Sequence, residues 1–435
     1  MSSDLQSLLA AIVADPSDDI ARFVYADCLQ EHGNSARAEF IRLQVEAERH
    51  HPHSNTRADL EQRAYTLFAA HWGEWWGEVC TAVGLGAEAK RYSILPGGAR
   101  IGEPIPSAEW LDILFDEPAE SGEKLTLPEI TFRRGFPEAV TFFPFAPENT
   151  AANSHLAQWH QVSPLVELVA AHGWVEGRQF GWLDGSFQRS VTTLTAEHFG
   201  AEMLAPVLRS PNLENVERAI VRFGASPQRA RFSELRHVLA ASFAPRLKHL
   251  VVPFWNDVGA AALGSPDVLP RLESLNVTLN GNSVTALARG TGLARLRHLA
   301  IHGWSSSADL NAACREPVWA QLRSLHLGYG RWETSLHALA AADGLRELEE
   351  CQLAGLTFTP EIVRDLVRAP LLKRVKHFAL VDGVYHDGRA LLPLVDIVDP
   401  ARIETFAVRM RYFPERAANA LRAKFGDRVR FLSTD

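Results

Sequence analysis

"LRHLAI", residues 296–301, decides the fold of this chain, because the same six-residue pattern returns at a nearly constant interval. The other copies are LKHLVV (247–252), LESLNV (272–277), LRSLHL (322–327), LEECQL (348–353), VKHFAL (375–380) and IETFAV (403–408). Successive copies start 25, 24, 26, 26, 27 and 28 residues apart. Two apolar residues one apart, such as Leu299 and Ile301, point to the same side of a short strand. Each copy therefore predicts a strand with one buried face.

The form L-x-x-L-x-L with a period of about 20 to 29 residues is typical of leucine-rich repeats. One such repeat cannot bury its apolar face alone, whereas stacked repeats share a continuous core. The Ala- and Leu-rich segments SVTALARG (283–290) and TSLHALAAA (334–342) suit helices between the strands. The pattern predicts an α/β fold, a leucine-rich-repeat solenoid with parallel strands on its concave side and helices outside.

Weaker copies extend the predicted array toward the N-terminus. They are PLVELVA (164–170), SVTTLTA (190–196) and NLENVERAIV (212–221), and RRGFPEAVTF (133–142) is a candidate first strand. The interval between Val216 and Leu247 is long, which predicts an insertion around 224–235. We expect the array to span 130–435, with a C-terminal cap from about 411 made of a helix and a short strand. Residues 81–129 show no period and are interpreted as an irregular connection.

Residues 1–80 predict a small helical bundle. Apolar residues recur at helical spacing, Pro16 interrupts the first helix, and Ser17-Asp18-Asp19 can cap the second. HWGEWWGEV (71–79) places three tryptophans at the end of a fourth helix. We interpret this cluster as the seam with the following domain, and a docking site is the alternative.

The segments LLAAIVADPSDDIARFVYADCLQEHG (8–33) and ARAEFIRLQ (36–44) resemble the bacterial repeat-companion domain, a short module found ahead of repeat regions. "RGFPEAV" (134–140) is likewise similar to the entry to such regions. One departure is Cys28, where the family pattern has Trp. The resemblance implies no catalytic residues. Asp27, Glu39 and Arg42 are interpreted as caps and ion pairs of the bundle, with a partner surface as the alternative.

Composition narrows the class of protein. The 435 residues carry a net charge of -8, which disfavours a nucleic-acid partner because nucleic-acid binders usually show a basic footprint. The four cysteines are far apart and predict reduced thiols. The apolar part of the N-terminus, 8–14, is too short for a signal peptide or a membrane span. We expect a cytoplasmic protein without a membrane partner, and its oligomeric state stays open.

The sequence carries no motif that we interpret as catalytic, cofactor-binding or metal-binding. There is no H-E-x-x-H, phosphate-binding loop or G-x-S-x-G elbow. His50-His51-Pro52-His53 lacks further ligands at a useful offset, so we predict a solvated loop rather than a metal site. The prediction is a protein that is not an enzyme, with no cofactor and no metal.

The predicted concave face is polar, and it supplies the candidate partner-binding residues. Strand positions give Asn276, His298, His302 and His326, and the strand ends add the aromatic residues Trp255, Trp304 and Tyr329. His298 and His302 would lie about 13 Å apart along one strand, so both cannot bind one metal ion. Polar residues rimmed by aromatics are typical of a protein-binding surface. The alternative is an ordinary exposed polar face.

These observations favour a non-catalytic protein-interaction scaffold that binds a macromolecular partner, most simply a protein, on the concave face. One alternative is a recognition subunit of a bacterial signalling or defence assembly. Another is an enzyme subunit with a site near 81–212.

Overall fold

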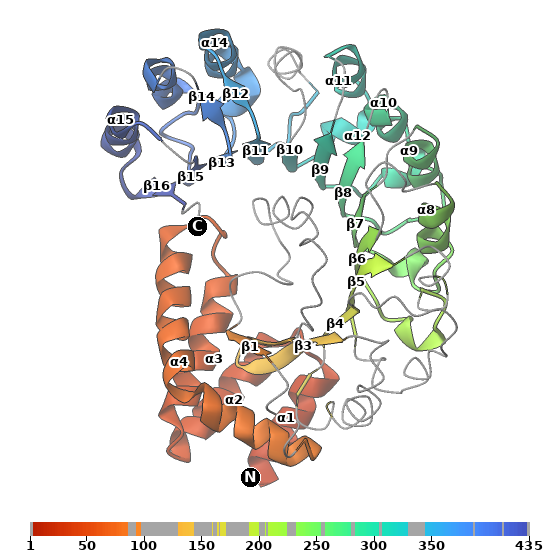
Figure 1. The fold of residues 1–435 in the computed structure, drawn as a ribbon, viewed down its shortest axis with the longest axis vertical. Helices are drawn as coiled ribbons and strands as arrows, with labels where there is room; N and C mark the ends of the chain where they lie inside the picture. Colours follow the sequence, from red (N-terminus) through yellow and green to blue (C-terminus); the bar gives the residue numbers. More distant parts are fainter. Residues whose placement is uncertain are drawn as a thin grey trace, which may run out of the picture.

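The computed structural model describes residues 3–85, 93–96, 129–142, 159, 163–164, 166–170, 191–199, 205, 208–223, 232–253, 257–279, 283–303, 307–328, 344–385, 388–410 and 413–432. They form a mixed α/β structure in which an N-terminal helical region precedes a sheet of mostly parallel strands (Figure 1).

Four helices make up the N-terminal region: α1 (Ser3–Ala14), α2 (Asp19–Glu31), α3 (Ser35–Glu48) and α4 (Asn55–Val83). Side-chain caps fix where they begin. Asp18 accepts hydrogen bonds from the backbone N–H of Ile20 and Ala21, and Ser54 accepts one from Arg57. Helix α4 ends at Val83 and is followed by the C-cap residue Gly84, whose φ of 70° suits a glycine. The predicted helical region is therefore present, and it extends to Val83.

Asp27, Glu39 and Arg42 link the helices by ion pairs, as predicted. Arg42 Nη2 lies 2.6 Å from Asp27 Oδ1 and joins α3 to α2. Arg63 Nη2 lies 3.2 Å from Glu39 Oε1 and joins α4 to α3. These side chains are largely exposed, so each pair contributes about 1 kcal/mol or less, and apolar packing between the helices is the larger stabilising term.

Among the described residues, fourteen strands form one sheet, and their order in space equals their order in the chain. The strands are β1 (Ser93–Pro96), β2 (Glu129–Arg133), β3 (Phe136–Phe142), β4 (Glu167–Ala170), β5 (Thr193–Phe199), β6 (Arg218–Phe223), β7 (His249–Pro253), β8 (Ser274–Leu279), β9 (His298–Gly303), β10 (Ser324–Gly328), β11 (Glu350–Ala354), β13 (His377–Val381), β15 (Thr405–Arg409) and β16 (Val429–Phe431). A separate parallel pair is formed by β12 (Thr357–Phe358) and β14 (Val384–Tyr385). Strand β1 lies within 81–129, so that interval is not irregular throughout.

All seven repeated hexapeptides contribute strands, β7 to β11, β13 and β15. Leu275 pairs with Leu299, and Leu299 pairs with Leu325, in register. The same line continues through Cys351, Phe378 and Phe406. All of these side chains are at most 2% exposed and belong to one core cluster. The predicted parallel strands with a continuous apolar spine are confirmed.

Short helices cover the outer side of the sheet: α8 (Phe232–Leu239), α9 (Asp257–Leu263), α10 (Ser283–Ala288), α11 (Ser307–Ala313), α12 (Pro317–Ala320) and α14 (Pro360–Arg368), together with the 3-10 helix η11 (Gly388–Asp396) (Figure 1). Leu263, Leu287, Leu310 and Leu366 from four of these helices are buried in the same core as the strands. The predicted insertion around 224–235 is described only from 232, where α8 begins.

Strands β2 and β3 are antiparallel, a hairpin that the sequence analysis does not predict. The turn of this hairpin consists of Arg134 and Gly135. Both residues have positive φ, 45° and 89°, as two-residue hairpin turns require. Gln44 of α3 holds this turn, because its Oε1 accepts a hydrogen bond of 2.7 Å from Gly135 N. A Cβ at Gly135 would lie 2.1 Å from Ile41 Cγ1, so only glycine fits between the turn and α3.

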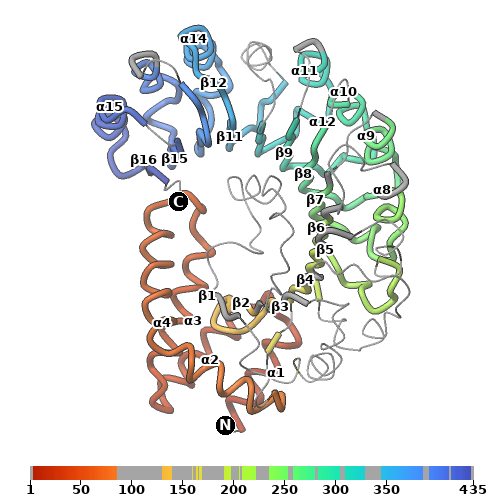
Figure 2. The backbone as a smooth tube through the Cα atoms, viewed as in Figure 1, coloured from red at the N-terminus to blue at the C-terminus, as the bar shows by residue number. Residues whose placement is uncertain are grey.

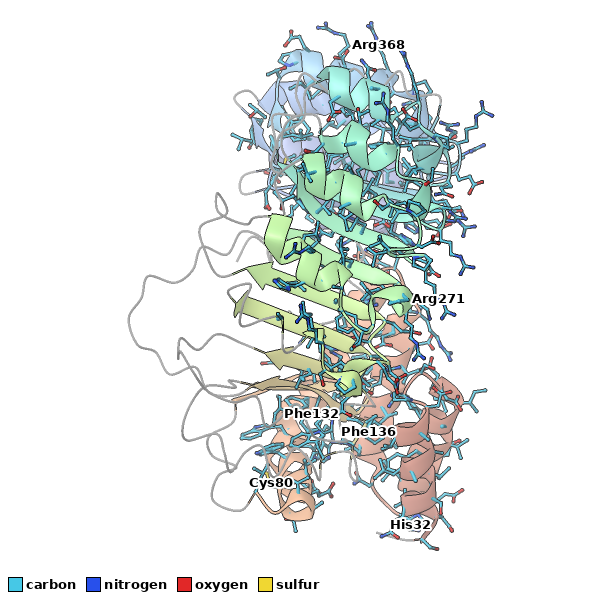
Figure 3. All side chains as sticks on the ribbon, turned by 90° about the vertical axis from the view of Figure 1, so that its right-hand side faces the viewer. His32, Cys80, Phe132, Phe136, Arg271 and Arg368 are labelled. Atoms are coloured by element: carbon cyan, nitrogen blue, oxygen red, sulfur yellow. The ribbon has the colours of Figure 1, made fainter. Side chains whose placement is uncertain are left out.

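The seam between the helices and the sheet contains aromatic rings and a buried ion pair. Phe68 packs on Phe132, and Tyr25 packs on Phe136. Phe132 and Phe136 are labelled in Figure 3. The ring centroids of Trp76 and Trp159 lie 6.0 Å apart, which confirms that the tryptophan cluster lies at the seam. Trp72 of the same cluster is 47% exposed. Arg22 Nη2 lies 2.8 Å from Glu138 Oε1, and both side chains are at most 1% exposed.

The C-terminal segment contains α15 (Glu415–Phe425) and β16, the helix and short strand predicted for the cap. Lys424 Nζ lies 2.6 Å from Asp396 Oδ1 and ties α15 to η11. The strands follow an arc with the helices on its outer side, and α3 and α4 lie between the two ends of this arc (Figure 2). We call the side of the sheet that faces the middle of the arc the inner face.

The apolar spine predicts a large difference between adjacent positions of β9. Leu299→Ala should lower the free energy of unfolding by about 2–5 kcal/mol, because it leaves a cavity in the middle of the core. His298→Ala, at an exposed neighbouring position, should change it by less than about 0.5 kcal/mol. Denaturant unfolding followed by circular dichroism measures both, and equal effects would contradict a continuous spine.

Candidate functional site

Polar side chains line up across the inner face because the strands pair in register. One line, the first row, runs through β8 to β15 and consists of Ser274, His298, Ser324, Glu350, His377 and Thr405. The next line, the second row, consists of Asn276, Ala300, His326, Gln352, Ala379 and Ala407. Asn276, His298 and His326, which the sequence places on the concave face, lie in these rows, and the rows alternate with the apolar spine.

The predicted partner-binding residues differ in exposure. His298 is exposed, as expected. Asn276, His302 and His326 are 1%, 0% and 6% exposed, so the expectation of an exposed face is wrong for these three. Trp255, Trp304 and Tyr329 lie outside the described residues. A role in partner binding stays a prediction for all seven.

Ser324, His326 and Glu350 bring a hydroxyl, an imidazole and a carboxylate together. Ser324 Oγ lies 3.0 Å from His326 Nε2, and Glu350 Oε1 lies 3.4 Å from the same nitrogen. A catalytic triad needs the hydroxyl and the carboxylate on opposite nitrogens of the ring, so that the imidazole relays a proton between them. Both groups meet one nitrogen here, and this geometry does not activate Ser324 as a nucleophile.

Glu350 is the anion of the site, and its side chain is 12% exposed. Burial alone would raise the pKa of its carboxyl group, but the polar contacts with His326 and His51 outweigh burial and hold that pKa well below its usual value. His51 Nε2 is 3.7 Å from Glu350 Oε1, an electrostatic contact longer than a hydrogen bond. Glu350 is therefore ionised at neutral pH.

The segment His50–His53 is not a solvated loop, and that prediction is wrong. The His51 ring stacks on the His377 ring at 3.8 Å with an interplanar angle of 7°. Thr405 Oγ1 lies 3.4 Å from His51 Nδ1 and 2.9 Å from His377 Nδ1. His53 is only 7% exposed. The connection between α3 and α4 therefore packs against the inner face at β11, β13 and β15.

Backbone and side-chain contacts strengthen this junction between the two ends of the chain. Asn55 Nδ2 donates a hydrogen bond of 2.6 Å to the carbonyl oxygen of Asp427. Arg430 of β16 donates to the carbonyl oxygens of Pro52 and Ser54, at 2.9 and 3.4 Å. We call these contacts, together with the packing of His51 and His53, the helix–sheet junction.

Imidazoles at the junction are held in their neutral form. Burial, and then the neighbouring His51, lower the pKa of His53 to about 3. Burial and then His51 lower the pKa of His377 to about 4, against the opposing effect of Glu350. Protonation of His53 or His377 therefore disfavours the closed junction.

Two inner-face amides are buried without hydrogen bonds. The side chains of Asn276 and Gln352 are 1% and 0% exposed. In the described structure neither the nitrogen nor the oxygen of either amide has a hydrogen-bond partner. An unpaired buried polar group costs roughly 1–3 kcal/mol, so these positions are unfavourable for the free protein.

At the N-terminal end of the sheet the inner face carries charges that the sequence analysis misses. Arg133 Nη2 lies 2.6 Å from Glu167 Oε2, and Thr195 donates a hydrogen bond of 2.9 Å to Glu167 Oε1. Glu167 shares the line of the first row with Arg218, through Thr193. Burial lowers the pKa of Arg218 to about 10, which still leaves it cationic at neutral pH. In VELVA and VERAIV, apolar residues alternate with other residues, and this alternation could have placed Glu167 and Arg218 on the inner face.

Within the described ranges no group of three His, Cys, Asp or Glu side chains is arranged to hold a metal ion. No helix among those residues has the length and apolar character needed to cross a bilayer. Comparison of the chain with protein-family models and with curated proteins gives no match.

The junction predicts a stability that depends on pH. The ordinary pKa of histidine is 6.5, and folding lowers it at His53 and His377, so their stabilising contribution is complete above about pH 6.5 and is lost as pH falls toward 4. The free energy that keeps the junction closed should fall by about 1–2 kcal/mol per histidine between pH 7 and pH 5. Hydrogen exchange in 49–55, corrected for intrinsic rates, measures this loss.

A double variant, His53→Gln and His377→Gln, is the matched control, because its side chains stay neutral at both pH values. It should lose most of the pH dependence. An unchanged dependence in the double variant would contradict the assignment to these two rings.

Proposed function

We propose that the chain is a non-catalytic protein-interaction scaffold whose inner face binds a partner protein. We further propose that its sheet and outer helices are a leucine-rich-repeat solenoid, and that residues 1–80 are a repeat-companion domain. The period of 24 to 28 residues, the strand order and the L-x-x-L-x-L pattern support the repeat assignment.

The observation that carries the proposal is the polar inner face itself. The outer side of the sheet buries the apolar spine against helices, and the polar residues of the first and second rows are not part of that core. These rows nevertheless hold aligned polar groups over six strands, and within the described structure two of these groups are amides without hydrogen-bond partners. Polar groups that cost stability in the free protein are expected where a ligand pairs with them.

A protein partner fits this face better than a nucleic acid does. The described inner positions of β8 to β11 include no Lys or Arg, and they carry the anionic Glu350. Binding to phosphates requires cationic side chains, whereas neutral hydroxyl, imidazole and amide groups suit polar groups of a polypeptide.

Chemistry at Ser324 is not favoured, because the imidazole of His326 cannot relay a proton from the hydroxyl to Glu350 through one nitrogen. The alternative of an enzyme site near 81–212 concerns a range that is described only in part, and it stays a prediction.

Affinity purification of the tagged full chain from its native cells tests the proposal. His298→Glu places a charge on the exposed part of the first row, and Arg368→Glu places the same side chain at an exposed position on α14, on the outer edge of the molecule (Figure 3). Wild type and Arg368→Glu should enrich the same protein, and His298→Glu should reduce its recovery at least about tenfold, a loss of 1.4 kcal/mol or more in binding.

A protein recovered equally with all three chains would contradict binding at the inner face. Circular dichroism and thermal unfolding of the variants separate lost binding from lost folding.

A further inference from the structure

The side-chain amides of Asn276 and Gln352 point to the chemistry of the ligand. We propose that they pair with two main-chain peptide groups of an extended partner segment, which crosses strands β8 to β11 roughly at right angles. This inference rests on the proposed function and adds the ligand class and its direction.

A carboxamide side chain can recognise a peptide group. Each amide offers an N–H donor and a C=O acceptor in one plane, the same pair that a peptide group offers in return. Asn276 and Gln352 are the inner-face residues in β8 to β11 whose amide atoms are all buried and unpaired within the described structure. A peptide group satisfies the donor and the acceptor of such an amide together.

The second step concerns spacing. In the second row, Asn276 is paired with Ala300, Ala300 with His326, and His326 with Gln352. Three strand spacings therefore separate the two amides, a distance of about 14 Å. An extended chain advances about 13–14 Å over four residues, so peptide groups four residues apart match the two amides.

The third step concerns what lies between the amides. Ala300 has the smallest side chain of these four positions and is 7% exposed. His326 directs its Nε2 toward Ser324 and Glu350 instead of leaving it for a ligand. Between the two amides, the second row thus holds one small side chain and one imidazole that is already engaged.

The first arm of the experiment measures thermal unfolding of the full chain. Asn276→Leu and Gln352→Met remove the amides with little change of shape, so the midpoint temperature should stay the same or rise. Gln321→Met is the matched control, because the Gln321 amide is paired: it donates to the carbonyl oxygen of Leu293 at 2.9 Å and accepts from Arg297 at 2.8 Å. This control should lower the midpoint.

The second arm uses a phage library of random 12-residue peptides selected on the wild-type chain. Selected peptides should bind the Asn276→Leu, Gln352→Met double variant at least tenfold more weakly than wild type, and should bind Gln321→Met as they bind wild type. N-methylation of one peptide bond at a time in a synthetic binder should weaken binding most at two positions four residues apart.

Three results would overturn the inference: a lowered midpoint for Asn276→Leu and Gln352→Met, failure of the library to yield binders, or binders that tolerate the double variant. A lowered midpoint for these two variants would show that the amides are already paired in the free chain. A partner that is lost with His298→Glu but retained with the double variant would leave the proposed function standing and remove this inference alone.

Discussion

In-register pairing of parallel strands is the constraint on which the rest of the structure depends. Once Leu275, Leu299 and Leu325 are neighbours, every position before and after them must also form a line across the sheet. Alternation along a strand then sends one set of lines into the core and the other to the inner face. A slip of one residue would exchange the two sets and bury Ser324 or Glu350 among leucines. The apolar spine therefore fixes the polar rows as well as the fold.

The N-terminal helices add a second constraint, because they contact both ends of the sheet. Gln44 and Arg22 hold the β2–β3 hairpin, and the segment His51–Asn55 holds the strands near the C-terminus. The buried ion pair of Arg22 and Glu138 adds little to the free energy of unfolding, because desolvation of both charges offsets much of their attraction. The helices thus set the separation of the two sheet ends, and they occupy the inner face at Glu350 and His377.

Sequence reasoning recovers the periodic part of this structure and misses the contacts between distant segments. The strands follow from apolar residues that repeat at fixed intervals, and the first and second rows follow from the same register. His51 illustrates the limit: its partners Glu350 and His377 lie about 300 residues away, and no local pattern records that contact. The burial of Asn276 and His302 was missed for a similar reason, because exposure depends on tertiary structure and not on strand alternation. The hairpin at Arg134-Gly135 had a local signal, the glycine, but Arg at a positive φ is an uncommon choice for such a turn.

One distance, between the start of α4 and the turn before β16, tests directly whether the helical region holds the last strands. Spin labels on cysteines introduced at Thr56 and Asp427, in a chain whose half-buried Cys28 is replaced by Ser, report on residues that flank the contact of Asn55 with Asp427. Pulsed electron resonance at pH 7.5 should give one narrow distribution at the short end of the measurable range. A broad distribution at long distances would show that the helical region does not hold the last strands, and it would contradict the packing of His51 against Glu350 and His377.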